Sequence, residues 1–128
     1  MTAKNLPGTL QPVSLTISQA LIREYAELTQ DFNPLHLDAD FAAATPMGGI
    51  IAHGTLSMNL LWQSLSETLG ERAQQATLDV KFIKPVRVGD RVTAHGRVDE
   101  ATPGRYLAWV ENQLGEKVID GTVELPAD

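Results

Sequence analysis

The chain has 128 residues, 43% of them hydrophobic, so we predict one folded domain over residues 1–128. It contains no cysteine, which excludes disulfide bonds, thiolate metal sites and a catalytic cysteine. The formal net charge of -6 argues against nucleic acid as a general partner, although it leaves room for an anionic ligand at a local basic patch.

The N-terminal sequence MTAKNLPGTLQP lacks the apolar core of a signal peptide. No apolar run approaches the roughly 20 residues that a membrane-spanning helix requires. We therefore expect a cytoplasmic protein with no membrane segment.

The first half of the chain predicts a short strand over residues 13–17, followed by a helix. Ser18 is a favourable N-cap for that helix, which should end near Asp31. Asp38 is the candidate N-cap of a short helix covering residues 41–44. The segment TPMGGI that follows is rich in turn-forming residues and predicts a loop.

The second half predicts a long helix and then an antiparallel sheet. The helix should run from Gly54 to about Leu69, with Gly70 ending it. Its first half, LSMNLLW, is apolar almost all round, which is typical of a buried helix. Four valine-rich segments read as strands, at residues 77–86, 91–98, 106–113 and 118–125. An α+β fold follows, in which the sheet wraps around the buried helix.

The segment QDFNPLH concentrates polar side chains in a short break between two helical patterns. Pro34 fixes its own φ and pushes Asn33 out of the α region, so the chain must turn there. If Asp31 and His36 lie close together, they can share a water molecule: one takes a proton from it and the other gives a proton to a nearby carbon. The alternative is that Asp31 caps a helix end and His36 lies on a solvated turn, since Asn-Pro is a common turn signal.

Gly54 opens the predicted buried helix. A helix N-terminus offers unpaired N–H groups and the positive end of the helix dipole, and a residue without Cβ lets a ligand approach them. Gly54 is therefore a candidate oxyanion site for a carbonyl, with tight packing of the helix start as the alternative. His53 beside it is expected to be a cap or a buried core residue, and we also keep it as a candidate substrate contact. The spacing of the three histidines predicts no metal site.

Four basic residues lie in or near two predicted strands: Lys81, Lys84, Arg87 and Arg91. They either form a solvated face of the sheet or bind phosphates at the mouth of a pocket. Glycine-rich phosphate-binding motifs are absent, so neither a P-loop nor a dinucleotide-binding fold is predicted.

The run DFNPLHLDADFAAAT, followed by IAHG, resembles the MaoC-like, R-specific 2-enoyl-CoA hydratase family over residues 13–125. The resemblance implies a hot-dog fold, a homodimer with the site at the subunit interface, and an acyl-CoA thioester substrate with no metal or redox cofactor. It also implies that Asp31 and His36 activate the water, that Asn33 fixes their geometry, and that Gly54 N–H polarises the thioester carbonyl. Lys84 and Arg87 then become candidate ligands of the coenzyme A phosphates.

One departure from the family concerns the predicted central helix. Some R-specific hydratases have a serine eight positions after the oxyanion glycine, where this chain has Trp62. We expect the indole either to restrict the acyl pocket to short or compact groups or to fill the core between helix and sheet.

The activity implied is reversible hydration of a 2-enoyl-CoA to a 3-hydroxyacyl-CoA, with the R isomer expected. Two alternatives stay open. A hot-dog thioesterase needs a carboxylate near the thioester carbon, but Glu67, the only acid on the predicted central helix, lies at its far end. A non-catalytic acyl-CoA-binding module would need the pocket but not the Asp31/His36 pair.

Overall fold

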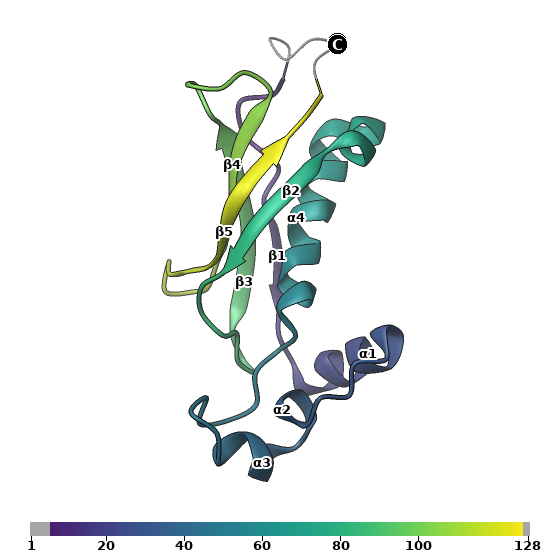
Figure 1. Ribbon diagram of the computed structural model, residues 1–128, viewed down its shortest axis with the longest axis vertical. Helices are drawn as coiled ribbons and strands as arrows, with labels where there is room; N and C mark the ends of the chain where they lie inside the picture. The colour runs from purple at the N-terminus through teal and green to yellow at the C-terminus, as the bar shows by residue number, and fades with distance from the viewer. Residues whose placement is uncertain (1–5, 127–128) are drawn as a thin grey trace.

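The computed structural model describes residues 6–126; residues 1–5, part of the N-terminal segment expected to lack a signal peptide, and residues 127–128 lie outside it. The described chain forms an antiparallel sheet with one long helix, α4, along one face, while three shorter helices gather beyond one end of the sheet (Figure 1). In chain order the elements are β1 (Val13–Thr16), α1 (Gln19–Thr29), α2 (Pro34–Leu37), α3 (Ala39–Ala43), α4 (Gly54–Leu69), the 3-10 helix η2 (Gly70–Gln75), β2 (Thr77–Phe82), β3 (Arg91–Val98), β4 (Arg105–Glu111) and β5 (Lys117–Glu124).

The sheet has five strands in the order β1-β3-β4-β5-β2, and every neighbouring pair is antiparallel. Burial alternates along the central strands, as a sheet with one covered face requires. On β4, Tyr106, Ala108 and Val110 are buried, while Leu107 and Trp109 between them are only half-buried. The predicted sheet around a central helix is therefore confirmed.

Helix α4 begins at Gly54 and ends at Leu69, as predicted, and Gly70 ends it with a φ of 60°. Leu56, Leu60, Leu61 and Leu65 are buried in the core. Asn59 and Gln63 are exposed, so α4 buries one side in this chain rather than its whole circumference. The buried helix predicted from LSMNLLW is therefore confirmed on the side that faces the sheet, while Asn59 lies on its exposed side.

Two segments differ from the sequence prediction, and proline explains part of each difference. Residues 34–37 form the short helix α2 instead of a simple turn, because Pro34 is tolerated in the first turn of a helix and the Asn33 side chain accepts a hydrogen bond from Leu35 N at 3.0 Å. Strand β2 ends at Phe82 rather than at residue 86. The backbone N–H groups of Ile83 and Lys84 both point to Val118 O, and the next residue, Pro85, has no N–H to donate.

The two predicted N-caps have the expected side-chain bonds. Ser18 accepts a hydrogen bond from Leu21 N at the start of α1, and Asp38 accepts one from Phe41 N at the start of α3. Among the described helices, none combines the length and the apolar character that a membrane span requires.

Candidate active site

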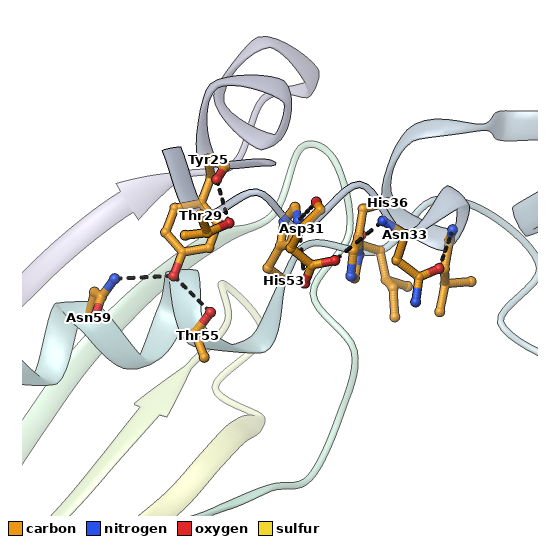
Figure 2. Close-up of polar contacts among 10 residues, drawn as sticks. Tyr25, Thr29, Asp31, Asn33, His36, His53, Thr55 and Asn59 are labelled. Atoms are coloured by element: carbon orange, nitrogen blue, oxygen red, sulfur yellow. Dashed lines mark hydrogen bonds and ion pairs between the residues drawn. The ribbon is translucent and has the colours of Figure 1, made fainter. Parts of the chain in front are cut away.

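The loop after α1 brings Asp31 and His36 toward the start of α4 (Figure 2). Helix α1 ends in a left-handed residue, Gln30, with φ 58°, which turns the chain back across the helix end. Asn33 N–H then donates to Asp31 Oδ1 at 3.3 Å. The Asn33 side chain caps α2 instead of hydrogen-bonding to the side chain of Asp31 or His36, so Asn33 orients Asp31 through its backbone and His36 through the helix it caps.

The neighbouring backbone fixes the orientation of His36. Its Nδ1 lies 2.7 Å from the carbonyl oxygen of Ile51. Because a carbonyl only accepts, Nδ1 must carry a proton. In the neutral ring Nε2 is then unprotonated and free to bind a water molecule or a substrate.

His53 is buried directly beside the pair. Its Nε2 lies 3.0 Å from the backbone carbonyl oxygen of Asp31 and 4.0 Å from Asp31 Oδ2. Its ring stacks on that of His36, with centroids 3.9 Å apart, and meets Tyr25 edge-on at 5.1 Å. His53 occupies the N-cap position of α4, but its side chain makes no capping hydrogen bond, so the expected capping role is wrong and the buried role is correct.

A pocket of about 450 Å³ opens beside these residues. Asp31, His36 and the first turn of α4 form its polar side. Its apolar side comes from the end of β2 and the loop that follows it, from β5, and from Met47 and Ile51 in the loop between α3 and α4. A small molecule in this pocket would contact an apolar wall on one side and the Asp31/His36 pair on the other.

Gly54 lies in the wall of the pocket, at the first position of α4. Its backbone N–H is one of the first four of the helix, which have no intrahelical acceptor. A Cβ at this position would lie 2.8 Å from the Phe82 ring. Both interpretations from the sequence therefore have a structural basis: close packing against Phe82 and unobstructed access to a helix N-terminus.

Asp31, His36 and His53 each offer a metal-ligating atom within 4.8 Å of the others. The two imidazole planes differ by only 29°, so their lone pairs run side by side instead of converging on one ion. Nε2 of His53 is also already bonded to a carbonyl. The arrangement therefore suits binding of a water molecule better than coordination of a metal.

The basic candidates are placed differently from what the sequence suggested. Lys84 does line the pocket, but it pairs with Glu116, and its hydrogen bond, together with one from Asn112, lowers the pKa of the Glu116 carboxyl. Arg87 does not line the pocket; its guanidinium donates to the carbonyl oxygen of Met47 and so anchors the loop at the pocket mouth. Arg87 as a phosphate ligand is therefore not supported in this chain.

Trp62 does not line the pocket either. It is half-buried and packs against the hydrophobic core, as the core-filling alternative expected. The physical reason is distance along the helix: eight residues at 1.5 Å per residue place Trp62 about 12 Å beyond Gly54. The pocket contacts only the first turn of α4.

Ser57 was not predicted as a site residue from the sequence. It is buried, it lines the pocket one turn after Gly54, and its hydroxyl has no hydrogen-bond partner among the described residues. The i, i+3 spacing from Gly54 is the signal that could have identified it, because residues three apart share a helix face.

Comparison with known proteins places this geometry among enzymes of acyl-CoA metabolism. A model of the family described as "MaoC like domain" matches residues 4–120. A 3-hydroxybutyryl-CoA dehydratase from Methylorubrum extorquens is 36% identical over 118 residues, covering 89% of this chain and 75% of the relative. An (R)-specific enoyl-CoA hydratase from Rhodospirillum rubrum is 35% identical over 126 residues, covering 94% and 88%.

Solved structures show the same likeness. The (R)-hydratase from A. caviae involved in PHA biosynthesis superposes with a TM-score of 0.77 at 32% identity, covering 96% of this chain and 99% of that one. The unliganded R-hydratase PhaJ1 from Pseudomonas aeruginosa gives a TM-score of 0.78 at 29% identity, with 99% and 86% covered. The expected hot-dog fold is thereby confirmed.

Proposed function

Because the chain belongs to the MaoC-like domain family, we propose that it is a hydro-lyase that adds water reversibly across the C2–C3 double bond of a 2-enoyl-CoA. The product is a 3-hydroxyacyl-CoA, in the R configuration by analogy with the (R)-specific relatives. The observation that carries the proposal is the placement of Asp31, His36 and Gly54 around one pocket. These three residues supply what the reaction requires: a proton acceptor, a proton donor and a site for a developing oxyanion.

The thioester carbonyl is proposed to bind at Gly54 N–H, so that C2 and C3 lie beside the Asp31/His36 pair. As water adds to C3, negative charge moves onto the thioester oxygen. A backbone N–H at a helix start stabilises that charge, and loss of such a donor typically costs about 3 kcal/mol of barrier.

Proton transfer then follows from the orientation of the two side chains. In hydration, the Asp31 carboxylate takes a proton from water while the oxygen bonds to C3. The protonated His36 delivers a proton from Nε2 to C2, leaving a protonated Asp31 and a neutral His36. Dehydration is the reverse: neutral His36 removes the C2 proton and protonated Asp31 protonates the departing hydroxyl. After hydration, a proton passes from Asp31 to His36 through solvent, which restores the starting protonation states, so the proposed cycle needs no metal or redox cofactor.

We also propose a homodimer. Strand β2 is the edge of the described sheet on the pocket side, and Phe82 and Ile83 at its end are 56% and 51% exposed. A second copy would cover these apolar side chains and pair the edge, as natural sheets do.

A cytoplasmic location is proposed as well, because acyl-CoA thioesters are made and used there.

Lys84 is the remaining candidate for the coenzyme A phosphates, since it lies at the pocket and its partner Glu116 is solvent-accessible. Exposed ion pairs of this kind contribute little to stability, so a phosphate can displace the carboxylate. Arg87 is not proposed, because it bonds to Met47.

The thioesterase alternative receives less support from the site. Glu67 is exposed and lies two residues before the end of α4, whereas the pocket contacts the first turn. A screen of 2-enoyl-CoA chain lengths tests the proposal, following loss of the conjugated thioester absorbance together with release of free thiol. Loss of absorbance without thiol supports hydration; thiol release without hydration would favour a thioesterase.

A further inference from the structure

We propose that His53 is a positioning residue, which holds the Asp31/His36 loop in place above the oxyanion glycine. This inference rests on the proposed hydratase function. His53 directly precedes Gly54 in the sequence, while its side chain contacts both residues of the pair. It thus connects the part of the site that moves protons to the part that stabilises charge.

His53 forms a hydrogen bond to the backbone of Asp31. A backbone carbonyl only accepts, so the 3.0 Å contact requires that Nε2 of His53 carries the proton and donates it. The bond is made to the backbone of Asp31, not to its carboxylate. It therefore fixes the position of the Asp31 backbone and leaves the Asp31 carboxylate available to bind water.

The ring of His53 also supports the ring of His36. The rings of His36 and His53 stack with their centroids 3.9 Å apart, and the ring of Tyr25 packs edge-on against His53. Tyr25 is itself held by α4, because its hydroxyl donates to Thr55 Oγ1 at 2.7 Å and accepts from Asn59 Nδ2 at 3.3 Å (Figure 2). The His53 ring therefore contacts an anchored side chain and can serve as a fixed support for His36.

The imidazole of His53 is less favourable for filling this space than an apolar ring would be. His53 is 2% exposed, and its Nδ1 has no hydrogen-bond partner among the described residues. A buried acceptor without a donor costs free energy that a phenyl ring of similar shape would avoid. Retention of an imidazole is explained if the bond from Nε2 to Asp31 is what the position requires.

A matched pair of variants isolates that hydrogen bond. Glutamine and methionine have similar length and volume, but only glutamine has an N–H to donate. We expect His53→Gln to keep kcat within about tenfold of wild type on crotonyl-CoA. We expect His53→Met to lose about 10² in kcat, with KM changed less than about threefold, because small misplacements of reacting groups have effects of that size. His53→Phe keeps an aromatic ring but has no hydrogen-bond donor, so its kcat should be as low as that of His53→Met.

A double-mutant cycle separates positioning from general structural damage. If His53 acts through Asp31, His53→Met should slow an Asp31→Asn enzyme by less than about threefold, since groups that act as a unit give non-additive losses. The inference is overturned if His53→Met or His53→Phe matches His53→Gln in kcat, or if the two losses multiply in the double variant. An inactive wild-type enzyme would overturn the proposed function as well. An active wild-type enzyme whose kcat is the same in all three His53 variants would overturn this inference alone.

Discussion

Asp31 and His36 are positioned mainly by backbone groups around them. Asp31 accepts from Asn33 N–H, and His36 donates to the Ile51 carbonyl. Their spacing within QDFNPLH suggested from the sequence that they could share a water molecule, and the family resemblance implied their catalytic roles. The contribution of His53 depends on a contact between residues 31 and 53 that only the folded chain creates, and for that reason the sequence did not predict it.

Replacing Asp31 by asparagine keeps the shape of the side chain but removes its ability to accept a proton from water. We expect Asp31→Asn to remain folded and to lose about 10²–10⁴ of kcat on crotonyl-CoA. Thermal unfolding compared with wild type checks the fold. Turnover close to the wild-type rate would exclude Asp31 as the base.

Replacing His36 by alanine removes the proposed proton donor to C2, so a loss of about 10²–10⁴ in kcat is expected. His95 on β3 offers a matched control, because it is also half-buried and its Nε2 lies 2.9 Å from a carboxylate oxygen of Glu111 on β4, but it lies outside the pocket. His95→Ala should retain wild-type turnover. A His36→Ala protein that is unfolded rather than inactive would support a structural role for His36 instead.

At the scale of elements, capping and stop residues predicted helix positions well. Ser18, Asp38 and Gly70 act locally, and each has the role that was predicted. Strand β2 was predicted too long because its apolar pattern continues past Phe82, while its end is set by pairing with β5, a non-local contact. The start of α4 was predicted, but the packing of Phe82 against Gly54 requires knowledge of the sheet.

Gly54→Ala tests what the start of α4 does. An added methyl would meet the Phe82 ring at 2.8 Å, and Phe82 is exposed enough for the ring to shift. We expect a folded protein whose kcat/KM falls at least about tenfold, because the methyl obstructs the approach of a carbonyl to the helix N-terminus. The double variant Gly54→Ala/Phe82→Ala distinguishes the alternatives: if it regains the activity of Phe82→Ala alone, Gly54 serves packing and not the oxyanion.

At the scale of the whole molecule, the sequence predicted the α+β class and the wrapped helix but not the order of the strands. Strand β2 pairs with β5, although β3 is its neighbour in the sequence. That order results from closing the sheet around α4, which no local pattern encodes. The pocket was therefore placed near the correct residues, but its extent was not predictable. The sequence left Trp62 open between a pocket role and a core role, and the pocket does not reach it.

The exposed edge predicts assembly. Because β2 has one paired side among the described strands and ends in exposed Phe82 and Ile83, sedimentation at micromolar concentration should show twice the monomer mass. Phe82→Asp should shift the distribution toward monomer by placing a charge in the proposed interface. A wild-type protein that sediments only as a monomer would contradict the dimer.

The proposed hydratase activity requires that water adds to C3 of a thioester that stays intact. Incubation with crotonyl-CoA in ¹⁸O-labelled water, followed by mass spectrometry and chiral assay of the product, tests it directly. We predict (R)-3-hydroxybutyryl-CoA with one labelled oxygen in the C3 hydroxyl and coenzyme A still attached. Labelled crotonic acid with free coenzyme A, or unchanged crotonyl-CoA, would contradict the account.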